Sequence, residues 1–173
     1  MNKEFLLENK RIIILSVIIL FLLISTFTSI WATLTKSQSS GNTKINSENT
    51  IGLWNNCVYT TLKGDINSNS TNCASISSDN IPTSFKITKI CVILSLILII
   101  AGVVLYYVKP EYNFNYILFI SAGIISLIGS ISWNSFLNNN DFKEYSFGYS
   151  WYFNLIAGIA SVASGVMIQQ NKL

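Results

Sequence analysis

Histidine is missing from this chain, and charged residues are scarce. None of the 173 residues is His, only 11% are Asp, Glu, Lys or Arg, and the formal net charge is +3. Without histidine, the chain lacks the commonest general base and the commonest metal ligand of proteins. A soluble domain carries roughly 25% charged residues, so this composition does not suit one. The small net charge and the lack of a basic block argue against nucleic-acid binding.

Apolar sequence is abundant instead. Half of the residues are hydrophobic, and the mean hydropathy is +0.46. A helix needs roughly 20 residues to cross hydrocarbon, and four uncharged stretches have about that length: 12–31, 90–108, 116–136 and 149–168. Backbone groups in lipid must be satisfied internally, and the stretches lack the alternation of a barrel strand. The expected fold is a membrane protein, a left-handed four-helix transmembrane bundle within a single domain, 1–173.

The basic residues around the first stretch favour cytoplasmic termini. Lys10 and Arg11 directly precede it, and positive charge favours the cytoplasmic side. We expect this stretch to stay uncleaved, because it is long for a signal peptide and Ile30 stands where a small residue is wanted. The expected location is the plasma membrane. The cytoplasmic segments are then 1–11, 109–115 and 169–173, and the extracellular loops are 32–89 and 137–148.

The long polar loop contains a pair of cysteines, Cys57 and Cys73. Two cysteines in one polar loop suggest a disulfide formed in the secretory lumen. The alternative is two free or metal-binding thiols, although a zinc site lacks further ligands here. The triplet that begins at Asn69, Asn-Ser-Thr, is an acceptor sequon for N-glycosylation. In a loop so rich in Asn and Ser, such a triplet also arises by chance.

The same loop is expected to fold as a small antiparallel sheet. β-Branched and aromatic residues in 50–62 alternate with turn formers, which predicts strands with turns near Asn55-Asn56 and near 63–65. More than fifty residues without structure would be unusual. A short helix in 79–88 would lead into the second span, with Pro82 near its start. The disulfide would staple this sheet.

Several of these residues together resemble a known family. Trp31 closes the first span, Gly52-Leu53-Trp54-Asn55-Asn56-Cys57 follows, and Cys73 is the second loop cysteine. This pattern is similar to the Trp, Gly-Leu-Trp-x-x-Cys and Cys signature of the claudin and peripheral myelin protein/epithelial membrane protein superfamily. Lys89 occupies the place of the basic residue, usually Arg, that the family has just outside its second span. Residues 147–165 resemble the fourth span of the epithelial membrane proteins.

The chain also departs from that family. The interval between the two loop cysteines is longer than usual. The last residues, 171–173, do not resemble the terminal Tyr-Val with which many claudins bind cytoplasmic scaffold domains. No cytoplasmic scaffold motif is therefore expected at this end.

The motif residues each have two interpretations. Trp31 either anchors the chain in the aromatic belt or packs the loop onto the bundle. Leu53 and Trp54 form the buried core of the small sheet, or they contact the lipid interface or a partner. Gly52 is expected to serve the backbone, at a bulge or a close contact.

Polar and small residues elsewhere also leave alternatives open. Lys89 either reaches to the membrane interface or pairs with Asp65 or Asp79. Three aromatic residues of the second loop either contact a neighbouring molecule or belong to the aromatic belt: Phe142, Tyr145 and Phe147. Small residues recur every fourth position in the third and fourth stretches, which favours close packing within the bundle over self-association: Ala122, Ser126 and Ser130, then Ala157, Ser161 and Gly165.

The residues argue against catalysis and against charged transport. There is no nucleophile–base pair, metal-ligand cluster or phosphate-binding loop, so no catalytic residue, cofactor or metal site is expected. Ionisable residues are absent from all four spans, which disfavours a proton-coupled transporter. The residues indicate an extracellular interaction surface, and the resemblance implies adhesion or barrier formation through self-association. Expected partners are membrane lipid and either a second copy or a larger membrane protein. The alternatives are an auxiliary subunit of a channel, receptor or other complex, and a regulator of membrane shape.

Overall fold

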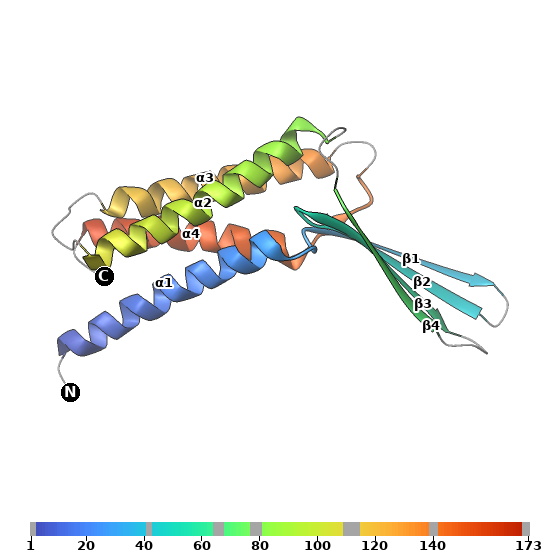
Figure 1. The fold of residues 1–173 in the computed structure, drawn as a ribbon, viewed down its shortest axis with the longest axis horizontal. Helices are drawn as coiled ribbons and strands as arrows, with labels where there is room; N and C mark the ends of the chain where they lie inside the picture. The colour runs from blue at the N-terminus through green and yellow to red at the C-terminus, as the bar shows by residue number, and fades with distance from the viewer. Residues whose placement is uncertain are drawn as a thin grey trace.

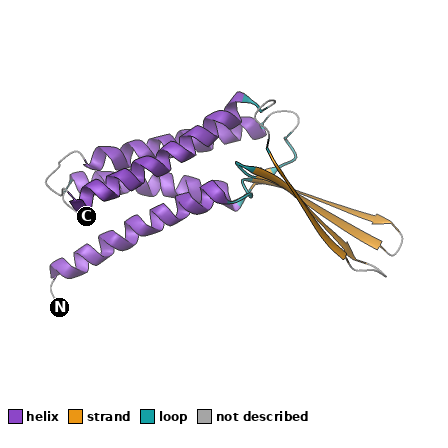
Figure 2. Cartoon of the chain, viewed as in Figure 1, coloured by secondary structure: helices purple, strands orange, loops and turns teal. Residues whose placement is uncertain are grey.

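The computed structural model describes residues 3–40, 43–63, 68–76, 81–108, 115–138 and 142–170. These ranges contain four helices and one five-stranded sheet (Figures 1 and 2). The helices are α1 (Lys3–Phe27), α2 (Thr83–Val108), α3 (Asn115–Leu137) and α4 (Tyr149–Gln169). The strands are β1 (Ala32–Ser40), β2 (Thr43–Ile51), β3 (Asn55–Lys63), β4 (Ser68–Ser75) and β5 (Ser146–Phe147).

Three helices, α2, α3 and α4, are long and apolar enough to cross a membrane. The apolar part of α1, Ile12–Phe27, is shorter. Helix α1 ends at Phe27, so the last residues of the stretch 12–31 form the connection to β1. Helix α2 starts at Thr83, and the short helix expected before the second span is its first turns. Many exposed side chains of the helices are Ile, Val or Leu, which suits contact with lipid.

The helices form a bundle from which the sheet projects at one end (Figure 1). Helix α3 packs against α2 and α4, while α1 packs against α4 and α2. The N-terminal end of α1 and the C-terminal end of α4 both lie at the end of the bundle away from the sheet. One core cluster lies within the bundle and combines residues of all four helices: Leu15, Ile18, Leu22, Leu96, Ile99, Phe119, Ala122 and Ala157.

The sheet is antiparallel, with the order β4-β3-β2-β1-β5. Four strands come from the long loop and β5 comes from the second loop, which confirms the prediction of a small sheet. The expected turn at Asn55-Asn56 is wrong, because both residues begin β3. The turn lies at 52–54 instead, where the N–H of Gly52 donates to the carbonyl of Asn55. The other expected turn follows Lys63 and falls mainly outside the described residues.

A buried polar cluster joins α3 to α4. Asn154 of α4 is fully buried, and its Nδ2 donates to the Ser126 carbonyl at 3.0 Å and to Ser130 Oγ at 2.9 Å. Ser126 Oγ in turn donates to the Asn154 side chain at 3.0 Å. Polar groups within hydrocarbon need such partners, because no water is available there. The cluster therefore fixes the register of the two helices.

Glycine and serine bring the same helices close together. A Cβ at Gly123 would stand 2.6 Å from the carbonyl of Gly158, and one at Gly165 would stand 2.9 Å from that of Tyr116. Ser161 Oγ donates across the contact to the Phe119 carbonyl at 2.8 Å. The small residues predicted from their spacing thus face the interior of the bundle.

Replacing Asn154 by Leu should destabilise the protein by about 1–2 kcal/mol, because Ser126 and Ser130 lose their partner in a site without water. Thermal unfolding in detergent should show a decrease in Tm of about 3–6 °C. Asn134→Leu is the matched control, since Asn134 is exposed on α3. Equal Tm values for the two variants would contradict a stabilising role of the cluster.

Candidate functional site

The end of α1 is closed by two tryptophan side chains. The last carbonyls of a helix have no partner within it and need one from elsewhere. Trp31 Nε1 donates to the Ser25 carbonyl at 2.5 Å, and Trp54 Nε1 donates to the Thr26 carbonyl at 2.6 Å. The N–H and the hydroxyl of Thr28 both donate to the carbonyl of Ile24. Both tryptophans of the motif therefore attach the sheet to α1.

Trp31 also belongs to an aromatic core between the sheet and the bundle. It is fully buried, and its ring meets Trp133 of α3 edge-on, with centroids 5.2 Å apart. Phe85 of α2 and Phe136 of α3 extend the cluster at 5.4 Å and 5.0 Å from Trp133. Leu53 is fully buried in the same core, whereas Trp54, expected to be buried with it, is 36% exposed and lies outside this core. Of the two interpretations of Trp31, the structure supports packing of the loop onto the bundle.

Two glycines hold the connection between α1 and β1 from either side. A Cβ at Gly52 would overlap the backbone of Ser29, and a Cβ at Gly148 would overlap that of Ile30. The carbonyls of Ile30 and Trp31 accept hydrogen bonds from Ser150 and Gly148 at the start of α4. The Gly52 position thus needs glycine because another backbone approaches closely.

Lys89 lies over the ring of Trp54. Its Nζ is 4.4 Å from the Trp54 centroid and 5.8 Å from that of Phe85. A cation held against an aromatic face is stabilised by the ring quadrupole. Because Trp54 also binds Thr26, the charge lies near the negative end of the α1 dipole, where a cation is favourable. The alternative partners of Lys89, Asp65 and Asp79, lie outside the described residues.

The disulfide joins two neighbouring strands. Cys57 of β3 and Cys73 of β4 are directly opposite in the register, with Cα atoms 4.1 Å apart and an S–S bond. The bond connects residues 16 apart in sequence, which on the chain-entropy estimate stabilises the fold by about 3 kcal/mol. The predicted staple of the sheet is confirmed. Among the described residues, no group of three Cys, Asp or Glu side chains could hold a metal ion.

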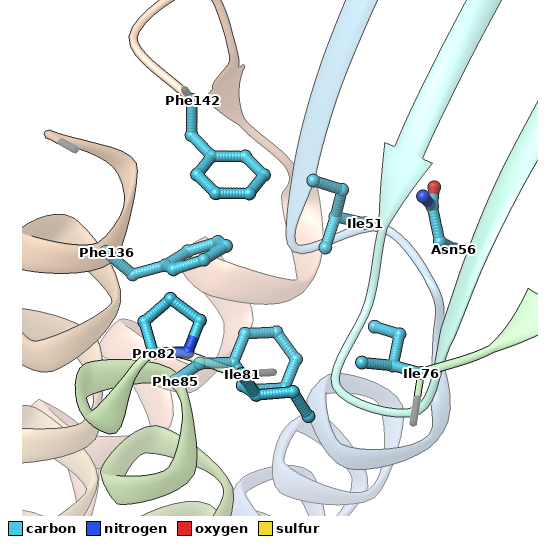
Figure 3. Close-up of a pocket in the computed structure, with 8 residues that line it drawn as sticks. All are labelled: Ile51, Asn56, Ile76, Ile81, Pro82, Phe85, Phe136 and Phe142. Carbon is cyan, nitrogen blue, oxygen red and sulfur yellow. The ribbon is translucent and has the colours of Figure 1, made fainter. Parts of the chain in front are cut away.

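A small apolar cavity lies between the sheet and the bundle. Its volume is about 180 Å³, and Figure 3 shows aromatic rings of the bundle side facing isoleucines of the sheet side. Asn56 is the polar residue in the lining; the others are Ile51, Ile76, Ile81, Pro82, Phe85, Phe136 and Phe142. Ligand pockets for organic molecules are usually 300–1,000 Å³, so the volume suits little more than one apolar side chain.

The second loop closes the far side of this core. Phe142 packs on Phe136 with centroids 4.4 Å apart, and Phe147 stacks on Trp151 of α4 at 4.3 Å. Glu144 of this loop forms an exposed ion pair with Lys36 of β1 at 2.9 Å. The loop aromatics thus contact their own core, which is a third role beside the two alternatives given by the sequence.

Some residues of the site have no sequence signal of their own. Trp133 lies within an apolar span, where it is indistinguishable from a membrane-interface aromatic residue. Gly148 contacts the connection that precedes β1, and Glu144 forms an ion pair with Lys36. Each of these partners is more than 100 positions away in the chain. Only a covarying set of homologous sequences would reveal such long-range pairs.

Apolar helices with a disulfide-bonded sheet at one end define an integral membrane protein. The model of the PMP-22/EMP/MP20/Claudin family matches residues 6–168, and the chain belongs to this family. A search of curated proteins gave no match to the chain. The resemblance carried by Trp31, Gly52, Leu53, Trp54 and the cysteine pair is thereby confirmed. This is a family of structural, non-enzymatic membrane proteins.

Gly52→Ala should loosen the sheet from the bundle, because the new Cβ collides with backbone that cannot move aside. We expect a loss of about 2 kcal/mol or more, measured by thermal unfolding and by limited proteolysis of the long loop. Gly102→Ala is the control, since its Cβ would meet side-chain atoms of Leu118 and Phe119 at 3.3 Å. An unchanged proteolysis pattern for Gly52→Ala would refute the close approach at Ser29.

Lys89→Gln should lower stability by about 0.5–2 kcal/mol, because the cation over Trp54 is lost. Lys89→Arg should preserve the stability, since a guanidinium stacks well on an indole ring. Unfolding in detergent at low salt measures both variants. Lys86→Gln on the same helix is the control, because Lys86 is exposed. If Lys89→Gln and Lys86→Gln have the same free energy of unfolding, the contact of Lys89 with the ring does not contribute to stability.

Proposed function

We propose that this chain is a claudin-like tetraspan that organises membrane or cell–cell contacts through lateral association of its sheet with a second copy. In this proposal the sheet lies outside the plasma membrane, and both termini are cytoplasmic. Family membership supports the tetraspan arrangement, and Lys10 and Arg11 support the orientation. The protein acts as a structural component without an enzymatic step.

The observation that carries the proposal is the way the sheet is held. It extends well beyond the bundle, yet its base is fixed by two indole hydrogen bonds, a buried aromatic core and two glycine contacts (Figure 1). A rigid projecting surface supports specific association, because little conformational freedom is lost on binding. A flexible loop would lose much more.

One face of the projecting sheet carries an apolar stripe. The register places Leu34 of β1 and Val58 of β3 on either side of Asn49, and further out Ile45 of β2 lies beside Leu62. All of these share a face with Ile51, which lines the cavity. Val58 remains 36% exposed, so its side chain is available to a partner. Apolar side chains of the stripe thus recur outward from the core of the protein, with the Ser47 and Thr60 pair between Val58 and Leu62.

The charges favour lateral association of copies over contact between the ends of their sheets. Lys36 lies on the apolar face and is compensated by Glu144, so this face lacks an uncompensated like-charge cluster among the described residues. At the far end, Lys44 and Lys63 are directly opposite each other on the other face. Two such basic ends repel each other, which weakens end-to-end contact.

Val58→Lys should weaken self-association at least about tenfold, because an unpaired charge would be buried between the apolar stripes of two copies. Tyr59→Lys is the matched control, since Tyr59 is the next residue on β3 and points to the opposite face. Co-purification of two differently tagged copies in mild detergent measures association, and imaging at cell contacts measures enrichment. Both variants must first show an unfolding transition like that of the unmodified protein.

The same purification tests the auxiliary-subunit alternative. A fixed ratio to a larger membrane protein, without binding between the two tagged copies, would replace our proposal. Equal association of Val58→Lys and Tyr59→Lys would show that the apolar face is not the contact surface. The expected result is that the protein associates in arrays at cell contacts. Val58→Lys should disrupt these arrays, and Tyr59→Lys should not.

A further inference from the structure

Strand β4 forms an open edge of the sheet. It pairs with β3 on one side, and among the described residues no strand pairs with its other side. All eight residues of β4 are exposed. An open strand presents unpaired N–H and C=O groups, to which a strand of another molecule can add.

The sequence of β4 lacks the residues that usually protect such an edge. Soluble proteins protect edge strands with Lys, Pro, bulges or covering segments. The sequence of β4, SNSTNCAS, contains neither charge nor proline. The opposite edge differs, because β1 is paired with β5 at Ala32 and Thr33, and its Lys36 is paired with Glu144.

The triplet Asn69-Ser70-Thr71 lies in the middle of this edge strand. It is the one Asn-x-Ser/Thr sequence in the 173 residues. Asn69 and Thr71 are exposed, and they share with Cys73 the face of the sheet opposite to the apolar stripe. A modification at Asn69 would therefore leave the apolar stripe accessible.

We propose that Asn69 is N-glycosylated and that its glycan prevents β4 from pairing with a strand of another molecule. In the secretory lumen, an oligosaccharide is transferred from a polyprenyl diphosphate donor to the side-chain amide. A bond forms between the sugar C1 and Asn69 Nδ2, the sugar–oxygen bond to the diphosphate breaks, and the polyprenyl diphosphate leaves while the amide loses one proton. No oxidation or reduction takes place.

The position of the glycan accounts for its protective effect. A strand added to β4 would lie about 4.8 Å away, and its side chains would stand beside Asn69 on the same face. A branched oligosaccharide occupies that space. The glycan thus has the role that a lysine has on other edge strands, and it directs association to the apolar face. This proposal rests on the proposed function, because glycosylation at Asn69 and the proposed association both require the sheet to lie outside the cell.

The modification is tested with the full chain expressed in a eukaryotic cell line. The unmodified protein and Ser70→Ala should each gain gel mobility in one step after treatment with peptide-N-glycosidase. Thr71→Ala and Asn69→Gln should migrate at the faster position without treatment. Ser70→Ala is the matched control, because it removes a neighbouring hydroxyl of the same strand and preserves the sequon. Failure of the unmodified chain to shift would overturn the proposal.

A separate variant distinguishes a wrong orientation from an unused sequon. Gln38→Asn combined with Thr71→Ala creates a new sequon with Ser39 and Ser40, and position 38 is exposed on β1. A shift of this variant, with none for the unmodified chain, means that the loop is outside and Asn69 is not used. No shift for either contradicts the orientation, and with it the proposed function.

The protective role is tested by the state of assembly. Thr71→Ala should form larger species than Ser70→Ala during size-exclusion chromatography in mild detergent, because the β4 edge is free to pair. Asn69→Lys should elute with the smaller species although it also lacks the glycan, since a charge on the same face of the edge strand replaces the sugar. If Thr71→Ala and Ser70→Ala elute alike, the glycan does not protect the edge.

Discussion

The carbonyl groups at the end of α1 impose the constraint on which the rest of the structure depends. Where a helix ends beside lipid, water is a limited source of hydrogen bonds, and each unpaired carbonyl is costly. Here the donors are the indole N–H groups of Trp31 and Trp54, which come from the sheet. The same two hydrogen bonds therefore satisfy the end of the helix and attach the sheet to it. This accounts for two tryptophans that lie on either side of the strands β1 and β2.

The remaining motif residues make this attachment geometrically feasible. Gly52 lets the turn after β2 approach the backbone of Ser29, and Leu53 fills the core beneath. Lys89 lies over the ring of Trp54, which stays partly exposed and is held by a hydrogen bond and a cation. The disulfide between Cys57 and Cys73 then extends the fixed part of the sheet to its open edge strand. The residues of the motif thus form one connection between the sheet and α1, which we call the joint.

Local patterns predicted the elements of the molecule, whereas contacts between distant segments escaped them. Uncharged stretches located the helices, and the spacing of Ser126 and Ser161 indicated which faces meet. The turn was misplaced at Asn55-Asn56, because asparagine favours turns locally while the close approach of Gly52 to Ser29 decides the true position. Strand β5 consists of two residues that pair with β1, and the Lys36–Glu144 pair joins two loops. Such features depend on contacts that form only in the folded bundle, so no periodic pattern in the sequence predicts them.

The joint also has a mechanical consequence. Because the indoles bind α1, the aromatic core includes α2 and α3, and Gly148 at the start of α4 donates to the Trp31 carbonyl, the sheet is attached to the whole bundle. A strand of nine residues is about 30 Å long, so a change of about 5° in the tilt of the bundle moves the far end by roughly 3 Å. Helix tilt responds to the thickness of the surrounding bilayer. A small change in the tilt of the helices therefore becomes a larger displacement at the far end of the sheet.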